Sequence, residues 1–320
     1  MLFGRKNDNA DPVAEGLAEL RHKRGLDALE KGVVSPDTLE RFRSGPAHGD
    51  LTCNEFLLTR EAGGEQLGMV MGSSFYKFNY LGLRGGSRPT SSGELSGLTG
   101  AMIEARRLAL HRMKQEAAAL GANGVIGVRL TVKRKAWDRS HLEFTAIGTA
   151  IRLPDYPPMA DPFTSDLSGQ DFWKLQKAGY LPRGLVFGLS CYYVATRSST
   201  MQVLTNVWAA GQANQEITQF TAGLSKARDI AVKRLRAETE HIMGEGTVGM
   251  EIDYEVEENE YEYGNTKYID LIITFSALGT AIIRNPHVTP DPAPSSLIII
   301  DLASGGSGPL RNAAAKETHQ

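Results

Sequence analysis

The chain has 320 residues, of which 41% are hydrophobic and 22% charged, and its formal net charge is −2. This composition is typical of a globular protein, and the near balance of charge gives no overall attraction to nucleic acid or to an anionic membrane. The two cysteines exclude a disulfide framework. No apolar targeting segment and no run of the ~18 apolar residues that a membrane helix needs is present, which predicts a cytoplasmic protein.

Residues 1–50 are expected to form a polar tail followed by one or two short helices. Apolar residues recur at helical spacing between positions 13 and 33. The run Ser35-Pro36-Asp37 then predicts an N-cap with proline in the first helical position, so that a second helix continues through Phe42. These N-terminal helices are a candidate surface for contact with other proteins.

Residues 51–153 and 167–285 are two copies of one unit, called repeat 1 and repeat 2 below. Seven residues of the first copy recur at a constant offset of 116, further ones at 122 and the last ones at 131. The changes of offset place the insertions in loops, as expected for a duplicated fold. The pairs at 116 are Leu51/Leu167, Phe56/Phe172, Ala62/Ala178, Gly63/Gly179, Gly68/Gly184, Gly72/Gly188 and Ser74/Ser190.

Each repeat is predicted to be an α+β unit with the order helix, strand, helix, strand, strand. Short helices are expected at 55–62 and 171–178, first strands at 67–75 and 185–194, and long helices at 98–120 and from 224 to 235. A proline-rich linker, 154–166, joins the repeats. A tail rich in proline and glycine, 286–320, follows them and contains one candidate strand at 297–300.

The two repeats differ in charge at equivalent positions. In the strand after each long helix, Arg129, Lys133 and Lys135 occupy the positions that Glu251, Glu255 and Glu257 occupy at offset 122. The residues between them alternate, so that Leu130 and Val132, and Ile252, Tyr254 and Val256, are expected to face the core. The six charged residues are either two independent solvated faces or a contact between repeats or subunits in which opposite charges favour alternation of the two repeats.

No metal or cofactor site is predicted. The seven histidines and two cysteines form no CxxC, HxH or HExxH pattern, and His111 and His241 do not align between the repeats. A site shared between subunits stays open. The glycine- and serine-rich segment 85–93 favours a flexible connector over a phosphate-binding loop, and the acidic stretch 257–263 favours a solvated hairpin tip over a cation site. No linear signature of an enzyme is present.

Repeat 1 resembles a known family. The residues that carry the likeness are Ala105-Arg106-x-x-Ala109, the run from Leu120 to Val128 and the stretch from Phe144 to Arg152 with its Gly-Thr-Ala. They are similar to the YbjQ-type family, also called heavy-metal-binding domains. Repeat 2 resembles it as a divergent copy. The resemblance implies a compact α+β domain that assembles into rings, usually pentameric, and it implies no established activity.

A self-assembling, ring-forming scaffold protein is therefore the first expectation, with the chain itself as partner. The alternatives are an oligomer that binds a small ligand or a metal ion and, more distantly, an unidentified enzyme. Two arrangements fit a chain with two repeats: two stacked five-fold rings with one repeat in each, or one ring in which the repeats alternate.

Overall fold

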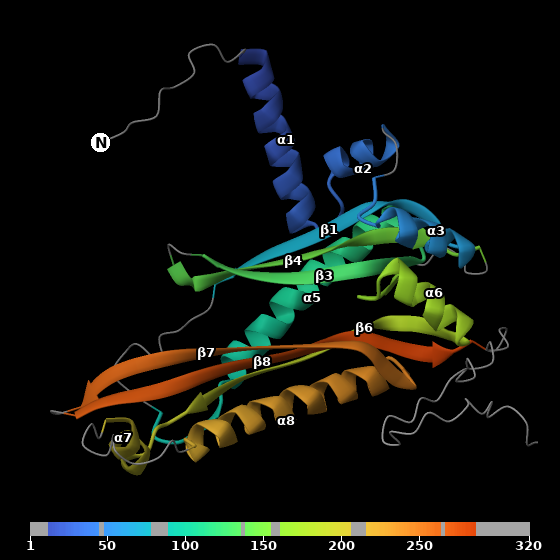
Figure 1. Cartoon of the computed structure of the whole chain (residues 1–320). Coiled ribbons are helices and arrows are strands. Elements are labelled where there is room, and N and C mark those ends of the chain that lie inside the picture. The colour runs from blue at the N-terminus through green and yellow to red at the C-terminus, as the bar shows by residue number, and fades with distance from the viewer. Residues whose placement is uncertain are drawn as a thin grey trace, which may run out of the picture.

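The computed structural model describes residues 12–44, 48–77, 89–135, 138–154, 161–205, 216–263 and 266–285. It is an α+β fold with two four-stranded sheets, each with a long helix on one face. Figure 1 shows four layers: the first sheet, helix α5, the second sheet and helix α8.

The first sheet has the strand order β1-β4-β3-β5. Strands β1, β4 and β3 pair antiparallel and belong to repeat 1, whereas β5 pairs parallel with β3. The elements of repeat 1 are α3 (Cys53–Glu61), β1 (Glu65–Lys77), β2 (Gly93–Glu94), α5 (Ser96–Ala119), β3 (Gly124–Lys135) and β4 (Asp138–Arg152), and β5 (Phe163–Thr164) lies in the linker.

The second sheet has the order β2-β6-β8-β7, in which every pair is antiparallel. Its strands β6, β8 and β7 correspond to β1, β4 and β3. The elements of repeat 2 are α6 (Gly169–Lys177), β6 (Tyr180–Val194), α7 (Ser198–Thr205), α8 (Thr218–His241), β7 (Gly246–Tyr263) and β8 (Thr266–Arg284).

The two sheets exchange short strands. β2 comes from repeat 1 but pairs with β6 of the second sheet, and β5 comes from the segment before repeat 2 but pairs with β3 of the first sheet. The expected flexible connector 85–93 therefore ends in a strand at Gly93, whereas residues 85–88 lie outside the described part. A two-residue strand carries no periodic signal, so neither exchange could be predicted from the sequence.

The recurring glycines have structural causes. Gly63 and Gly179 both have φ +79° directly after the short helices, a conformation that glycine adopts without strain. Gly127 and Gly249 also have positive φ, and each lies at a bulge where the strand register shifts by one residue.

The short helices begin two residues earlier than expected, at Cys53 and Gly169, because Thr52 and Ser168 cap them. The side chain of Thr52 accepts from the Glu55 backbone N–H while the Glu55 carboxylate accepts from Thr52 N–H, which satisfies two N–H groups at the helix start. The other long elements lie close to their predicted places, although β6 and α8 are longer than predicted.

Helix α5 has two buried faces. Ala105, Ala109 and Met113 pack on the first sheet, and the Ser74 hydroxyl donates to the Ala105 carbonyl. Met102 and Leu110 pack against the second sheet in the same apolar cluster. One helix thus covers two sheets, and α8 covers the opposite face of the second sheet (Figure 1).

One expectation about the core is wrong. Ile252, Tyr254 and Val256 of β7 are 51%, 57% and 44% exposed, and Val132 of β3 is 39% exposed. Residues 249–256 of β7 are exposed on both faces of the strand, because a single helix is narrower than a sheet of three long strands. Within the described residues, α8 packs mainly on β6 and β8, and its end reaches the start of β7, where the Thr239 and Thr247 hydroxyls lie 3.0 Å apart.

The N-terminal residues form α1 (Pro12–Glu30) and α2 (Pro36–Arg43), and Ser35 caps α2 with Pro36 in the first turn, as predicted. Figure 1 shows α1 standing away from the first sheet. Residues 297–300, the candidate C-terminal strand, lie outside the described residues. In the part of the chain that the structure describes, no helix is long and apolar enough to cross a membrane.

Gly188→Ala should destabilise the protein by about 3 kcal/mol, because a Cβ there would lie 1.8 Å from the carbonyl oxygen of Ala231 on α8. Gly100→Ala on α5 is the control: its Cβ would have no neighbour within 4 Å, and alanine favours a helix by up to about 1 kcal/mol. Urea unfolding at one fixed protein concentration measures both. Equal midpoints for the two variants would contradict this packing.

Candidate functional site

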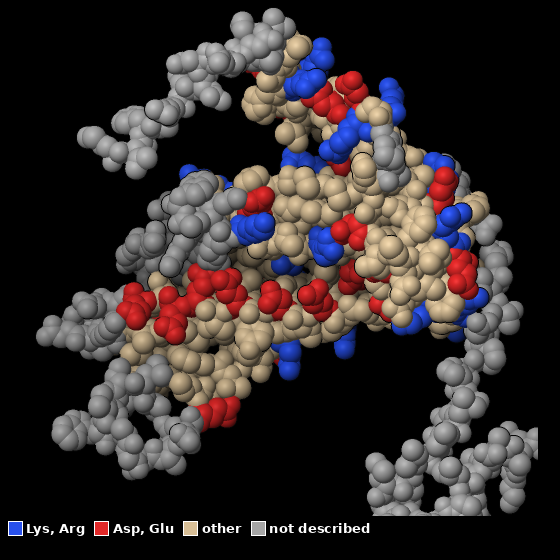
Figure 2. All heavy atoms as spheres, turned by 45° about the horizontal axis from the view of Figure 1, so that its top comes forward, with Lys and Arg blue, Asp and Glu red and all other residues tan. Residues whose placement is uncertain are grey.

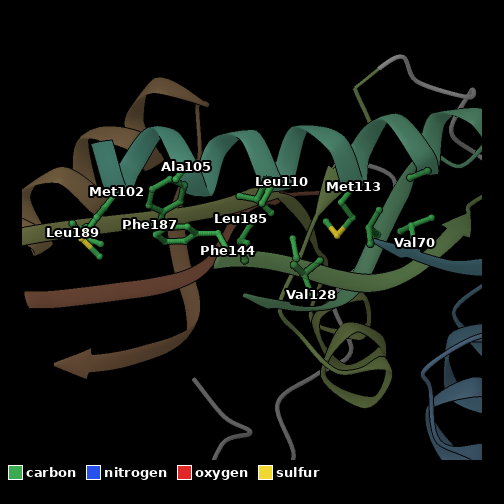
Figure 3. Close-up of a cluster of buried hydrophobic side chains, with 14 of the residues drawn as sticks. Val70, Met102, Ala105, Leu110, Met113, Val128, Phe144, Leu185, Phe187 and Leu189 are labelled. Atoms are coloured by element: carbon green, nitrogen blue, oxygen red, sulfur yellow. The ribbon is translucent and has the colours of Figure 1, made fainter. Parts of the chain in front are cut away.

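The contact between the two repeats is the most extensively built site in the described chain. Met102 and Leu110 of α5 pack against Leu185, Phe187 and Leu189 of β6 (Figure 3). The Sγ of Cys191 lies 3.4 Å from the Sδ of Met102. All of these side chains are buried. Apolar burial of this kind is the main favourable term in association between protein surfaces.

Backbone hydrogen bonds cross the same contact beside the apolar cluster. Leu95 N–H donates to the Cys191 carbonyl at 2.8 Å, and Cys191 N–H donates to the Thr99 hydroxyl at 3.0 Å. The β6 edge is thereby paired by repeat 1 at the point where α5 begins, and β2 extends the pairing to Tyr192 and Tyr193.

A second set of backbone bonds joins the linker to β3. Ser165 N–H donates to the Val125 carbonyl at 2.8 Å, and Val128 N–H returns a bond to the Ser165 carbonyl at 2.9 Å. Gly127 N–H, at the bulge, donates to the Leu167 carbonyl at 2.9 Å. The edge of β6 is therefore hydrogen-bonded by repeat 1, and the edge of β3 is hydrogen-bonded by the linker and the start of repeat 2.

Among the described residues, two ion pairs join α8 to repeat 1, and the closer of the two is Arg234 with Glu94. The Arg234 guanidinium on α8 binds the Glu94 carboxylate through both terminal nitrogens, with 2.9 Å between Nη2 and Oε2, and Nη1 also donates to the Leu189 carbonyl at 2.8 Å. Burial alone would raise the pKa of Glu94, but the hydrogen bonds and charge of Arg234 outweigh it and lower that pKa. Glu94 is thus held ionised.

A buried arginine lies on the outer face of α5. Arg106 is 9% exposed, and its Nε has no hydrogen-bond partner among the described residues. Burial lowers the pKa of Arg106 to about 10. Burial likewise raises the pKa of the Cys191 thiol to about 11, so that this cysteine is a neutral packing residue rather than a nucleophile at neutral pH.

A cleft of about 610 Å³ opens at one end of the contact. It brings together Arg107 and His111 from α5, Arg183 from β6, and Glu238 and His241 from α8. Sequence reasoning did not connect the two histidines, because they come from non-equivalent turns of the two helices. The cleft has both apolar walls and cationic groups, which suits an anionic small molecule.

Two carboxylates line this cleft: Asp161, which forms an ion pair with Lys114, and Glu238, which is engaged as well. It accepts the Phe187 N–H at 2.9 Å, and Arg107 lies 3.8 Å away. Burial raises the pKa of Glu238, although the bond from Phe187 opposes that shift. Among the described residues, no group of three His, Cys, Asp or Glu side chains is placed to hold a metal ion.

The six charged candidate residues lie on the equivalent strands β3 and β7. The backbone of Arg129 pairs in register with Ile147 of β4, and Glu251 pairs with Leu278 of β8, which confirms that the positions correspond. Arg129 forms an ion pair with Asp50, the residue directly before repeat 1.

Acidic side chains lie in a row along β7 (Figure 2). This row includes Glu251, Glu255 and Glu257, whereas Lys133 is exposed on β3 and the side chain of Lys135 lies outside the described part. The expectation that the basic and acidic rows meet between repeats or copies stays a prediction.

Sequence reasoning missed Glu94 and its pairing with Arg234. A signal was available: Arg234 recurs as Arg112 and Glu94 recurs as Glu216, both at the offset of 122. In each repeat, an acidic residue lies just before the long helix and an arginine lies within that helix, which indicates that the two side chains form an ion pair. The partner of each could not be assigned without the strand exchange.

Comparison with known proteins gives matches over both repeats. The sequence model of a family described as "Putative heavy-metal-binding" matches residues 59–154. An encapsulin nanocompartment protein of Mycobacterium tuberculosis is 38% identical over 242 residues, which cover 73% of this chain and 85% of that protein.

Shorter relatives match over the length of a single repeat. A UPF0145 protein of Halorubrum lacusprofundi is 44% identical over 90 residues, which cover 28% of this chain and 85% of that protein. A UPF0145 protein of Acinetobacter baylyi is 34% identical over 102 residues, which cover 31% of this chain and 92% of that protein.

Glu94→Gln should lower the free energy of unfolding by about 1–3 kcal/mol at pH 7, because it removes the charge from a partly buried pair. The folded-state pKa of Glu94 lies below its ordinary value of 4.5, so the contribution is present above that value and is lost as the pH falls. The difference between wild type and variant, measured by urea unfolding, should therefore vanish in acid. Glu104→Gln, an exposed control, should change stability little. A Glu94→Gln effect that is independent of pH would contradict the ion pair.

Proposed function

The chain belongs to the YbjQ-type family, and we propose that it is a self-assembling structural protein whose copies join head to tail into a ring. The relative that matches across both repeats is named an encapsulin nanocompartment protein, which supports a role in assembly. Catalytic chemistry is not needed for this role. The copies join through two exposed apolar surfaces, one on β1 and one on β7.

The observation that carries the proposal is a comparison of two equivalent sheet faces. Leu185, Phe187 and Cys191 of β6 are 8%, 4% and 0% exposed, because α5 covers them. Their equivalents on β1 at offset 116 are Met69, Met71 and Phe75, which are 45%, 45% and 63% exposed. The same face is thus covered by α5 in repeat 2. In repeat 1 it is largely exposed and borders helix α1, of which Leu26 and Leu29 line a hollow with Met71.

The opposite end of the chain carries the complementary surface. In repeat 1, α5 supplies side chains that cover the second sheet, and Val128 of β3 is buried in the same apolar cluster at 2% exposure. The equivalent of Val128 in repeat 2 is Met250, which is 48% exposed, and the apolar row continues along β7 through Ile252, Tyr254 and Val256. Contiguous exposed apolar surfaces mark interaction sites.

The interface between the repeats therefore forms once within the chain. Its two complementary surfaces are also exposed, one on β1 and the other at β7. When the β7 end of one copy contacts the β1 face of the next copy, the internal contact is reproduced between copies. Such a heterologous contact closes into a ring when its rotation divides a full turn. In that ring repeat 1 and repeat 2 alternate, so n copies place 2n repeats around the axis, in preference to two stacked rings.

A second candidate function rests on the cleft beside the internal contact. Arg107 and Arg183 point to an anionic small ligand, in line with the alternative of a ligand-binding oligomer. Calorimetric titration with inorganic pyrophosphate tests it: Arg107→Gln and Arg183→Gln should each weaken binding at least fivefold, whereas Arg60→Gln on α3 should not. Absence of binding to the wild-type protein, or equal binding by all variants, would count against this candidate.

Met71→Lys and Ile252→Lys should each lower the assembled mass, because each places a charge on one of the two open apolar faces. Mass photometry over a range of protein concentrations measures the effect, with at least a tenfold rise expected in the concentration at half-assembly. Glu61→Lys, on the exposed end of α3, is the control. A wild-type protein that stays monomeric at micromolar concentration would overturn the proposed function.

A further inference from the structure

We infer that Glu216 of one copy forms an ion pair with Arg112 of the next copy, with Ile217 beside β1 of that neighbour. The inference rests on the proposed head-to-tail assembly and names the polar contact that sets its register. It is argued from a contact that already exists once within the chain.

The internal template has three parts. Glu94 lies directly before α5 and reaches Arg234 on α8, and Arg234 also donates to the Leu189 carbonyl of β6. The arginine thus fixes the helix of one repeat to its own strand and at the same time holds the acid that precedes the helix of the other repeat. This geometry joins the two repeats at one point.

Arg112 reproduces the arginine of this template. It lies at the same place in α5 as Arg234 does in α8, and its Nη1 donates to the Ser73 carbonyl at 2.6 Å. Ser73 is the equivalent of Leu189 at offset 116. Among the described residues, no carboxylate forms an ion pair with Arg112. The guanidinium is therefore oriented as in the template, with the acid position unfilled by the described part of its own chain.

Glu216 reproduces the acid. It is exposed and lies directly before the N-cap residue of α8, as Glu94 does before that of α5. The two N-cap residues also share a backbone conformation: Leu95 has φ −82° and ψ 74°, and Ile217 has φ −87° and ψ 79°. Ile217 thus already has the backbone conformation that Leu95 has where it pairs with β6 within the chain.

The outer face of α8 agrees with this assignment. Thr99 and Arg106 of α5 are buried at the internal contact, and the same residue types recur as Thr221 and Arg228. Both equivalents are exposed, and the side chain of Arg228 is 58% exposed. The face that α5 uses to cover β6 is therefore present on α8 with its residues in place and open. We assign the β1 face of a second copy as its occupant.

Charge reversal tests the pair. Arg112→Glu and Glu216→Arg should each raise the concentration at half-assembly at least tenfold by mass photometry, because each places like charges opposite one another. The variant that carries both changes should recover most of the wild-type assembly. Arg60→Glu and Glu61→Arg on α3 are the matched charge controls and should assemble as the wild type does.

Cross-linking tests the register independently of the loss of the Arg112 bond to Ser73. Glu94 and Tyr192 are register partners within the chain, and their equivalents are Glu216 and Tyr76. In a Cys53→Ser background, a mixture of Tyr76→Cys and Glu216→Cys chains should form mixed disulfide dimers on oxidation. The buried Cys191 should not compete. Either variant chain alone should give no disulfide dimer.

The results distinguish the ion pair between Glu216 and Arg112 from the assembly itself. A wild-type oligomer that neither the charge reversals nor the mixed cysteines affect would overturn this contact and leave the proposed function standing. A wild-type monomer would overturn both. Cross-linking of the Tyr76→Cys chain with itself would show that like faces meet, which contradicts the pairing of Glu216 with Arg112.

Discussion

Each sheet of this chain has two faces to cover, and each repeat brings one long helix. The chain meets this constraint by placing α5 between the sheets, so that one helix has an inner face of small residues, such as Ala105 and Ala109, and an outer face with Met102 and Leu110. α8 then covers the far side of the second sheet. Two surfaces stay exposed: the outer face of β1, and the face formed by α8 and β7. The proposed contact between copies joins these two surfaces.

The duplication explains why the two open surfaces fit each other. The internal contact and the proposed contact between copies are built from equivalent positions, down to the glycines at the bulges and the N-cap conformations of the long helices. The copies have nevertheless diverged. β6 carries Leu189 and Cys191 where β1 carries Ser73 and Phe75, and β7 is acidic where β3 is basic. Divergence of this kind allows alternation to be favoured over contact between like repeats.

Much of the fold follows from the sequence, because the repeat offsets and the helical and strand periods are local signals. Gly63, Gly121 and Gly179 mark turns by their positive φ, and Ser35 marks a cap. The exposure of Ile252 and Tyr254 could not be predicted, because alternation indicates an apolar face but not how far a helix extends across it. The cleft of His111 and His241 depends on how the repeats pack, which no linear spacing encodes.

The most direct test of the central claim is an electron cryomicroscopy reconstruction of the purified assembly. The account predicts one ring in which β7 of each copy lies against β1 of the next, with Glu216 near Arg112 at every contact between chains. Two stacked rings, in which repeat 1 contacts repeat 1 and repeat 2 contacts repeat 2, would contradict it.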